Sequence, residues 1–414
     1  MKISQCRVCK EEKLETVLEY GDVALADSFM NSEQDFKNEQ KYPLRLCFCR
    51  NCSHLQIDEI IDPEILFRNY VYETGVSSSI IQFAKELYDE VLSFYRTIPS
   101  SGKPKVFEIA SNDGTVLSVF KENDSEVFGV DPAENIVKIA NNKGIDSIAE
   151  FFCFETAEKV VDLKGKFDVC LARNVIAHVK ELHSVAKGIQ TVLNENGFAV
   201  IEVPHLKTMF EELQYDQVFH EHIGFHSLDS IRRLFAFYDM EVVHVKELWI
   251  HGGSIRIFLQ HKNGPRKTTQ QVQDLLKAEE DLGLFDKTSW DGFAKRVLDH
   301  RVALKEELKR LKAENLNVAV YGASGKGQSL LQFCELDGSV IDYVVDKSSM
   351  KQGKFTPGTH LQVHSPSHIY EDLPDVILIC AWNFADEIVK QEARFAELGG
   401  KFLHPLPMPH YLKA

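Results

Sequence analysis

The sequence contains no long apolar run and no excess of basic residues. No stretch approaches the ~20 consecutive apolar residues that a membrane-spanning helix needs, and the first residues, MKISQCRVCKEEK, lack the apolar core of a secretory signal. Acidic residues outnumber basic ones, 62 to 47, which gives a formal net charge of −15. Because such a surface repels phosphate backbones, we do not expect nucleic-acid binding. The missing apolar runs indicate a cytoplasmic protein that does not bind membranes. A local basic pocket for one phosphorylated small molecule is still compatible with this charge.

The nine cysteines are not expected to form disulfides, because these are rare in the cytoplasm. Four of them fall into two close pairs, Cys6-x-x-Cys9 and Cys49-x-x-Cys52. A folded loop that brings the pairs together supplies four thiolates for a tetrahedral Zn(II) ion, whereas the plainer alternative is a set of buried thiols. Four thiolates leave no open coordination position, so we expect a structural zinc site. Cys47, two residues before the second pair, is either a core residue or a competing ligand.

The middle of the chain alternates between apolar strands and helices. Strands are expected at 106–109, 126–131, within 166–179 and at 196–204, and the residues from 80 and from 115 have helical spacing. This alternation predicts a parallel sheet with helices on both faces. A chain of 414 residues is also too long for one ordinary core, so two or three domains are expected.

A G-x-G-x-x-G fingerprint is missing from the first strand–helix loop, which makes a dinucleotide less favoured there. The loop from Ala110 to Gly114 consists of small residues instead, so its backbone N–H groups can approach a ligand. Asp131 ends the second strand and can accept hydrogen bonds from two ribose hydroxyls, although strand ends also carry acids for ordinary turn reasons. Ligands of such sheets lie at the carboxyl ends of the strands. We therefore expect an adenosine cofactor, with S-adenosylmethionine favoured.

Several motifs together resemble one family. EIASNDGTVL (108–117) resembles the E-I-G-S-N-D-G loop of class I methyltransferases, and further markers are CRVC with CRNC and HLQI, YVYETGVSSS, NVIAHV, and DQVFHEHIGFHSL with HGGSIRIF. From Cys6 to HPLP (404–407), the chain resembles the S-adenosylmethionine-dependent nucleotide-sugar C-methyltransferases. The resemblance implies an α/β protein in which a class I methyltransferase Rossmann-like fold (69–265) is flanked by a small N-terminal zinc-binding domain (1–68) and by linking helices with a C-terminal Rossmann-like substrate-binding domain (266–414).

The resemblance also implies the residues of the site. The cofactor is expected at Glu108, Ala110, Asn112, Asp113, Asp131, Pro132 and Asn174. The catalytic candidates are His222, Glu221, His178, His220, Tyr70 and Tyr72. By match, His222 is the favoured base, Glu221 supports it, and the two tyrosines belong to a segment that covers the active site. A pair of tyrosines two residues apart also fits an exposed strand face.

C-methylation of a keto-sugar needs a base that removes a proton from the carbon next to the carbonyl, and polar groups that stabilise the oxyanion. An imidazole suits this step near neutral pH. The family commonly has a tyrosine three residues before the histidine, but this chain has Phe219, which cannot donate, accept or ionise. Either His222 carries more of the chemistry, or His220 replaces the hydroxyl, or the acceptor differs. A metal site on His222 and His226 is less favoured, because no third ligand accompanies them.

The last third of the chain predicts a second doubly wound unit after a charged, solvated helical segment (267–314). In NVAVYGASGKGQSLLQFC (317–334), Gly322, Gly325 and Gly327 are spaced for a phosphate-binding turn at a helix N-terminus. The resemblance favours binding of the nucleotide-sugar here, at Gly322, Ser324, Lys326 and Gly327, with His251 near the acceptor. A purely structural role and an NAD site are the alternatives for this unit.

We therefore expect a C-methyltransferase that uses S-adenosylmethionine to deprotonate and methylate a carbon next to the carbonyl of a nucleotide-linked keto-deoxysugar. Such an enzyme acts on a small molecule, and we expect a monomer or a weak dimer. The second hypothesis is O- or N-methylation of another small metabolite, which needs only a base or a positioned lone pair. The third is a non-catalytic nucleotide-binding protein.

Overall fold

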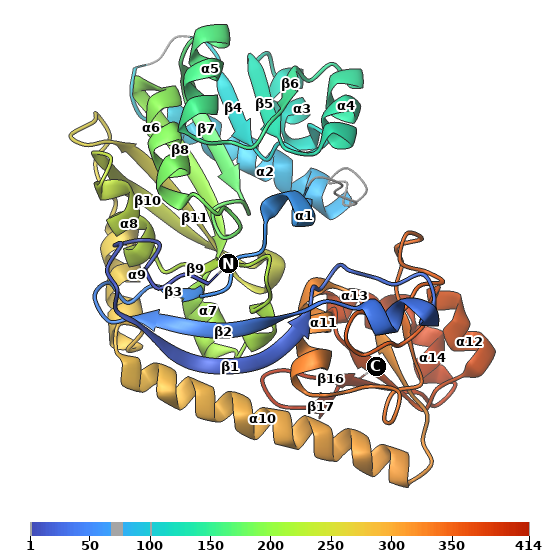
Figure 1. Cartoon of the computed structure of the whole chain (residues 1–414). Helices are drawn as coiled ribbons and strands as arrows, with labels where there is room; N and C mark the ends of the chain where they lie inside the picture. The colour runs from blue at the N-terminus through green and yellow to red at the C-terminus, as the bar shows by residue number, and fades with distance from the viewer. Residues whose placement is uncertain (1, 68–77, 100–101, 414) are drawn as a thin grey trace.

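The computed structural model describes residues 2–67, 78–99 and 102–413 (Figure 1). Within these residues the strands form three sheets, with the orders β1-β2-β3-β9, β10-β11-β8-β7-β4-β5-β6 and β14-β13-β12-β15-β16-β17. The seven-stranded sheet forms the upper part of the molecule in Figure 1, the six-stranded sheet lies at its lower right, and the β1–β2 hairpin lies between them. No helix in this described part of the chain is long and apolar enough to cross a bilayer.

The N-terminal sheet is completed by a strand from the middle of the chain. Its strands are β1 (Leu14–Ala24), β2 (Lys41–Cys49), β3 (Leu55–Ile57) and β9 (Gly224–Phe225). Short helices η1 (Glu33–Asn38) and α1 (Pro63–Phe67) accompany it. Antiparallel pairing places Leu55 opposite Phe225 and Gln56 opposite Gly224. The histidine-rich segment therefore belongs structurally to two units at once.

The seven-stranded sheet combines five parallel strands with an antiparallel hairpin. The parallel strands are β4 (Val106–Ile109), β5 (Val127–Asp131), β6 (Ser147–Ala149), β7 (Phe167–Arg173) and β8 (Leu193–Pro204), and the hairpin is β10 (Met240–Leu248) with β11 (Ser254–His261). Helices α2 (Ser78–Tyr95), α3 (Thr115–Glu122), α4 (Glu134–Asn142), α5 (Phe154–Lys164), α6 (Leu182–Val192) and α8 (Leu228–Ala236) flank these strands, and α7 (Leu206–Glu211), η3 (Tyr215–Gln217) and η4 (Ile250–Gly252) lie in the connections. Strand β4 is buried at all four positions, as apolar strands covered on both faces must be. The predicted parallel sheet with helices is confirmed.

The C-terminal sheet is also a doubly wound unit. Its strands are β12 (Val318–Tyr321), β13 (Tyr343–Val345), β14 (Val363–His364), β15 (Val376–Ile379), β16 (Lys401–His404) and the antiparallel β17 (His410–Tyr411). Its helices are α11 (Gly325–Phe333), η5 (Pro366–His368), α12 (Ile369–Asp372), η6 (Trp382–Phe384), α13 (Ala385–Gln391) and α14 (Ala393–Glu397). The strand, loop and helix expected in 317–334 are β12 and α11 with the turn between them.

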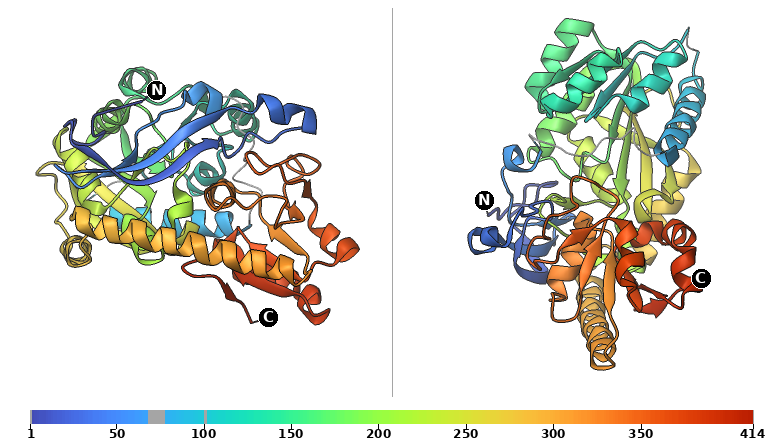
Figure 2. Two further views of the ribbon diagram at one scale, coloured as in Figure 1. Left: turned by 60° about the horizontal axis from the view of Figure 1, so that its bottom comes forward. Right: turned by 90° about the vertical axis from the view of Figure 1, so that its right-hand side faces the viewer.

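The charged segment 267–314 is helical as expected, but it is not merely a solvated linker. It forms α9 (Gln270–Asp281) and α10 (Lys287–Ala313), and α10 runs as one long rod from the seven-stranded sheet to the C-terminal unit (Figures 1 and 2). One face of α10 is buried, at Trp290, Phe293, Val297, His300, Leu304, Leu308 and Leu311. These positions recur every three or four residues, which is the spacing of one helical face. The many charged residues on the exposed face make this row of buried positions hard to recognise in the sequence.

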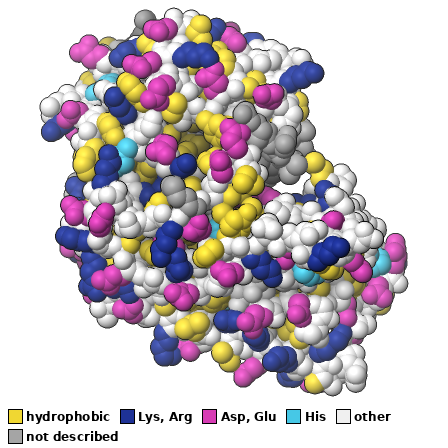
Figure 3. All heavy atoms as spheres, viewed as in Figure 1, with side chains coloured by type: hydrophobic (Ala, Val, Ile, Leu, Met, Phe, Trp, Pro, Cys, Tyr) yellow, Lys and Arg dark blue, Asp and Glu magenta, His cyan; other side chains and the backbone are white. Residues whose placement is uncertain are grey.

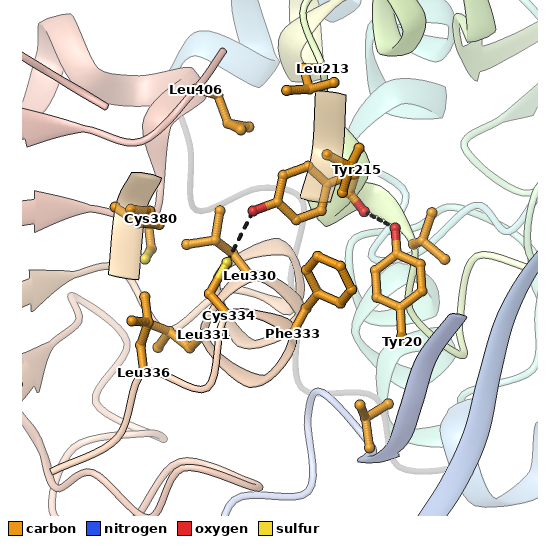
Figure 4. Close-up of a cluster of buried hydrophobic side chains, with 14 of the residues drawn as sticks. Tyr20, Leu213, Tyr215, Leu330, Leu331, Phe333, Cys334, Leu336, Cys380 and Leu406 are labelled. Carbon is orange, nitrogen blue, oxygen red and sulfur yellow. Dashed lines mark hydrogen bonds between the residues drawn. The ribbon is translucent and has the colours of Figure 1, made fainter. Parts of the chain in front are cut away.

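A cluster of buried side chains joins the three units (Figure 4). The Tyr20 hydroxyl of β1 donates to the Tyr215 carbonyl at 2.7 Å. The Tyr215 hydroxyl lies 2.9 Å from His300 Nδ1 on α10 and 3.2 Å from Cys334 Sγ, just after α11. The Phe333 ring packs against both tyrosines, with centroid separations of 4.7 and 5.3 Å. Because this core is continuous, the segment that carries the histidines is fixed relative to both flanking units.

Candidate active site

A cavity of about 670 Å³ lies at the carboxyl ends of the parallel strands. Figure 3 shows the surface hollowed in its upper half, with hydrophobic side chains inside the hollow. The lining comes from all three units: Asp27 follows β1, Ala110 and Asn174 follow β4 and β7, and Lys326 belongs to α11. A cleft of this size and position is typical of a site for small molecules.

One end of the cavity has the features expected of the cofactor site. Ala110, Asn112, Asp131, Pro132 and Asn174 all line it. Asp131 Oδ2 accepts the Asn112 N–H at 3.0 Å and Oδ1 accepts the Ala133 N–H at 2.9 Å, so this carboxylate holds the first loop to the second strand. Ala110 and Asn112 have positive φ angles of 54° and 50°, a backbone conformation in which successive N–H groups turn toward one side of the loop. These residues fit an adenosine cofactor.

Two residues that were predicted to bind the cofactor lie behind the residues that line this end of the cavity. Glu108 is buried beside Arg173, whose Nε is 3.6 Å from Glu108 Oε1, and burial raises the pKa of Glu108 to about 8 although Arg173 opposes the shift. Asp113 accepts from the Thr115 hydroxyl at 2.7 Å and pairs with Lys143 at 2.7 Å. Burial alone would raise the pKa of Asp113, but these hydrogen bonds lower it. Neither side chain lines the cavity, so each supports the loop from behind.

Several lining residues were not expected from the sequence. Four of them, Glu150, Phe151, Phe152 and Cys153, form the connection after β6, and Arg173 and Glu202 lie at the ends of β7 and β8. Strand β6 has only three residues, which is too short to give a clear alternation or apolar run. Glu202, near the end of β8, carries the same sequence signal as Asp131, an acid at the end of a strand.

The segment DQVFHEHIGFHSL runs from the end of η3 through a turn and the short strand β9 to the start of α8, so its histidines do not lie on one helix. His222 Nδ1 lies 2.8 Å from the Gln217 carbonyl oxygen, and His178 Nδ1 lies 2.9 Å from the Glu221 carbonyl oxygen. Because a carbonyl only accepts, each Nδ1 carries the proton and the lone pair is on Nε2. The two rings meet edge to face with centroids 4.8 Å apart, and both residues line the cavity. Burial lowers the pKa of His178 to about 4, so this ring is neutral near pH 7.

Glu221 also lines the cavity, but its carboxyl group does not contact His222 through a hydrogen bond in the described structure. The partner that orients His222 is the Gln217 carbonyl instead. Burial raises the pKa of Glu221 to about 8; Asp27 raises it further and Lys351 opposes the shift. The support expected from Glu221 therefore reaches His178, through the main-chain carbonyl, rather than His222.

The other two histidines of this segment face away from the cavity. His220 Nε2 donates to the Pro43 carbonyl at 3.1 Å, and its ring meets Tyr42 edge to face at 5.9 Å. His226 Nδ1 lies 3.3 Å from the Ser230 hydroxyl, and its ring packs on His54 with centroids 4.9 Å apart. Neither lines the cavity. In the part of the chain that the structure describes, histidines take no part in a cluster that could hold a metal ion.

Three of the sequence candidates cannot be placed by their side chains. Tyr70 and Tyr72 lie outside the described residues. The backbone of His251 belongs to η4, whose first residue, Ile250, lines the cavity, but the His251 side chain is outside the described part of the structure.

The glycine loop of the C-terminal unit meets the cavity at Gly325 and Lys326 only. Ser324 Oγ accepts the Gly327 N–H at 3.2 Å and caps α11, and Gly322, with φ 101°, packs closely on Ala381. Asp346 accepts the N–H groups of Ala323 and Ser348 at 2.7 and 2.8 Å. Asp346, which follows β13, thus holds its loop in the same way as Asp131 holds the cofactor loop.

Lys326 is held near the middle of the molecule by an aromatic ring and an acid. Its Nζ lies 4.7 Å from the centroid of the Trp382 ring, and Trp382 Nε1 donates to Asp216 Oδ2 at 2.5 Å. Burial lowers the pKa of Lys326, while Asp216 and Glu212 oppose the shift. An ammonium group in this position offers an anionic ligand a charge inside the cavity.

The four paired cysteines come together as expected. Their sulfur atoms all lie within 4.8 Å of one another; Cys6 Sγ is 3.5 Å from Cys52 Sγ, and Cys9 Sγ is 3.6 Å from Cys49 Sγ. Tetrahedral zinc with Zn–S bonds of ~2.3 Å needs sulfur atoms about 3.8 Å apart, so the four thiols fit Zn(II). Cys47 is not part of this group.

Comparisons with known proteins agree with this arrangement. Family models match a zinc binding domain at 6–67, a methyltransferase domain at 81–245 and a C-methyltransferase C-terminal domain at 249–407. C-methyltransferase NovU from Streptomyces niveus is 32% identical over 412 residues, which cover 100% of this chain and 97% of NovU. The mitochondrial ubiquinone biosynthesis O-methyltransferase of Arabidopsis thaliana is 28% identical over 189 residues, 43% of this chain and 46% of the relative.

Among solved structures, magnesium protoporphyrin IX methyltransferase from Synechocystis PCC 6803 with bound S-adenosylmethionine aligns with 50% of this chain and 100% of its own, at 12% identity and a TM-score of 0.36. The family assignment rests on the three family models and on the full-length relative. The chain is therefore an enzyme, and the hypothesis of a non-catalytic nucleotide-binding protein is wrong. Along its whole length it belongs to the S-adenosylmethionine-dependent C-methyltransferases that join a zinc-binding domain, a methyltransferase domain and a C-methyltransferase C-terminal domain.

Proposed function

We propose that the enzyme methylates a carbon next to the carbonyl group of a nucleotide-linked keto-deoxysugar. The observation that carries the proposal is one cavity that the cofactor loop at Ala110 and Asn112, the imidazole of His222 and the cation of Lys326 all reach. A methyl donor, a base and an anion-binding group are the three parts that such an acceptor requires.

His222 is the base in this proposal. Its Nδ1–H is held by the Gln217 carbonyl at 2.8 Å, so the ring is oriented and its basic nitrogen is Nε2. Nε2 removes the proton from the carbon next to the carbonyl, and the electron pair of that C–H bond moves toward the carbonyl oxygen. S-adenosylmethionine, when bound, supplies an electrophilic methyl group on a sulfonium centre, which the electron-rich carbon accepts.

His178 and Phe219 shape the space around this base. The ring of His178 lies edge to face with that of His222, and the Phe219 ring packs on His222 with centroids 4.1 Å apart. Phe219 also reaches the C-terminal unit: a Cβ on Gly325 would lie 3.0 Å from its Cε2 atom. The partly exposed ring of His222 is thus packed against two aromatic rings at the wall of the cavity.

Lys326 and the start of α11 suit the anionic part of the acceptor. A pyrophosphate beside Gly325 would meet the ammonium group of Lys326 and the positive end of the helix. The loop residues Gly322, Ser324 and Gly327 then act by holding this turn rather than by contact with the ligand.

The test is incubation of the enzyme with S-adenosylmethionine and nucleotide-linked keto-deoxysugars in D₂O. We expect S-adenosylhomocysteine by mass spectrometry, and deuterium in unreacted acceptor at the carbon that is methylated. Methylation without any exchange of carbon-bound hydrogen, and with the methyl group on oxygen or nitrogen, would favour the second hypothesis. The partial match to an O-methyltransferase is the observation that keeps that hypothesis under test.

A further inference from the structure

The carboxyl group of Glu221 is placed at the junction of the three units. It lies between His220 and His222 in sequence, lines the cavity, and only 9% of the residue is exposed. Its own main-chain carbonyl is occupied by His178 Nδ1. Among the described residues no cation pairs with this carboxyl group and no donor bonds to it, unlike Asp131 and Asp346, which each accept two backbone N–H groups.

The charged groups around Glu221 favour its neutral form. After burial, the negative charge of Asp27, on the connection after β1, raises the pKa of Glu221, and the positive charge of Lys351, after β13, opposes this shift. Lys351 Nζ donates to the Ala323 carbonyl at 2.8 Å and lies 3.8 Å from Asp27 Oδ1. The nearby imidazoles are His178 and His222, and Lys326 faces Asp216 and Glu212 on the α11 side. A buried carboxyl beside a second acid keeps its proton.

The carbonyl oxygen of the acceptor needs a hydrogen-bond donor, because negative charge develops on it as the proton leaves the adjacent carbon. Phe219 lines the cavity beside the base, but it offers no hydroxyl group. His178 cannot take over, because its Nδ1–H is used by the Glu221 carbonyl and its Nε2 is an acceptor. His220 cannot either, because its ring faces Pro43 outside the cavity. Glu221, by contrast, lines the cavity directly before the base in sequence, and among the described residues its carboxyl group has no hydrogen-bond partner.

We propose that Glu221, as a neutral carboxylic acid, donates a hydrogen bond to the carbonyl oxygen of the acceptor while His222 removes the proton from the adjacent carbon. This role rests on the proposed function, and it differs from the expected role of Glu221 as a carboxylate that supports His222. As the C–H bond breaks, its proton goes to His222 Nε2, its electron pair forms a carbon–carbon double bond, and the carbonyl pair moves to the oxygen. Glu221 keeps its proton and stabilises that oxyanion, as a neutral carboxyl in an apolar site can.

The pH dependence of turnover tests this role. For the intact enzyme we expect turnover to fall as the pH rises through about 8, because burial and Asp27 raise the pKa of Glu221 to that value and only the protonated form donates. In Glu221→Gln an amide N–H replaces the acid O–H, so we expect turnover within about tenfold of the unmodified enzyme and no fall above that pH. In Glu221→Ala we expect a loss of about 10²–10³ in turnover, the usual effect of removing one oxyanion donor.

Replacing either of two charged neighbours of Glu221 should shift the pH of the alkaline fall in turnover, in opposite directions for the two. Asp27→Asn removes a negative charge, so the alkaline fall should move to lower pH, whereas Lys351→Met removes a positive charge and should move it to higher pH. Circular dichroism and S-adenosylmethionine affinity check that each variant is folded. If Glu221→Gln is as inactive as Glu221→Ala while it binds the cofactor, or if the alkaline fall persists unchanged in Glu221→Gln, the role is refuted.

The same assay separates this role from the proposed function. Deuterium exchange and carbon methylation by the intact enzyme, together with an inactive but folded Glu221→Gln variant, would overturn the role of Glu221 alone. Methylation of oxygen or nitrogen without exchange would overturn both, because no enolate oxygen would then need a donor.

Discussion

At the scale of single residues, the chemistry depends on which nitrogen of each histidine carries the proton. Backbone carbonyls of Gln217 and Glu221 hold Nδ1 of His222 and His178, respectively. Second-layer hydrogen bonds of this kind select the tautomer and aim the basic nitrogen. His220 has its Nε2 on the Pro43 carbonyl instead, so two histidines separated by one residue are expected to behave differently.

His222→Asn should therefore lower turnover by about 10²–10⁴, the usual contribution of a general base, while S-adenosylmethionine affinity is kept. His220→Asn is the matched comparison, and at temperatures where it is folded we expect turnover within a few-fold of the unmodified enzyme. Single-turnover kinetics and calorimetry with the cofactor measure both quantities. Equal losses in the two variants would contradict the assignment of the base.

Buried histidines also make folding sensitive to acid. Burial lowers the pKa of His178 to about 4 and of His226 to about 3, and it lowers the pKa of His54 strongly. The unfolded chain binds these protons near pH 6.5, so their neutral burial stabilises the fold above that pH and the stability is lost as the pH falls toward 4. Urea unfolding at pH 7.5 and 5.5 should give a lower free energy of unfolding at pH 5.5. His226→Asn should weaken this dependence, and an unchanged slope in that variant would count against the explanation.

At the scale of elements, the segment that carries the four paired cysteines is linked directly to the loop that carries His178. Arg7, between the first two cysteines, donates through Nη2 to the carbonyls of Val179 and Lys180, the latter at 2.9 Å. His183 Nε2 adds a contact to the Val8 carbonyl at 3.0 Å. Strand β9 extends the N-terminal sheet with the segment that follows His222. These contacts link the cysteine cluster to the segments that carry His178 and His222.

Cys6→Ser should release zinc, lower the melting temperature and reduce turnover, because one of four thiolates is lost and the Arg7 contacts loosen. Cys47→Ser is the matched control: Cys47 is buried outside the sulfur cluster, and burial raises the pKa of its thiol to about 11, so it should retain a full equivalent of zinc. Metal content by mass spectrometry decides between them. Loss of zinc in the Cys47 variant instead would show that the ligand set is wrong.

At the scale of the whole molecule, the cavity exists only because three units meet. The core around Tyr20, Tyr215 and Phe333 joins the first strand, the histidine segment and α11. The buried face of α10 holds the C-terminal unit at a fixed distance from the seven-stranded sheet. Lys326 and His222 therefore line the same cavity although 104 residues separate them in the chain.

Lys326→Met should raise KM for a nucleotide-linked acceptor at least tenfold, because a buried ammonium that meets a phosphate is removed, and it should leave cofactor affinity unchanged. Lys347→Met is the control, since Lys347 is an exposed residue of the same unit that pairs with Glu387. Calorimetry with a nucleoside diphosphate, with NAD alongside, reads the binding directly. Tight binding of NAD, or equal affinity of both variants for the diphosphate, would contradict the proposed acceptor site.

Local patterns in the sequence determined much of this protein. The spacing of the cysteine pairs predicted the sulfur cluster, the apolar runs at 106–109 and 126–131 predicted parallel strands, and the small-residue loop with Asp131 predicted one end of the cavity. Each of these depends on neighbours within a few residues or on the shared edge of one sheet, so the chain itself carries the information.

Only the tertiary structure decided the rest. It placed β9 in the N-terminal sheet, buried one face of α10, and turned His220 and His226 away from the cavity that His222 and His178 share. It also surrounded Glu221 with Asp27 and Lys351, which come from units at opposite ends of the chain. The protonation of a carboxyl group depends on burial and on charges a few ångströms away, and neither quantity is set by the residues next to it in sequence.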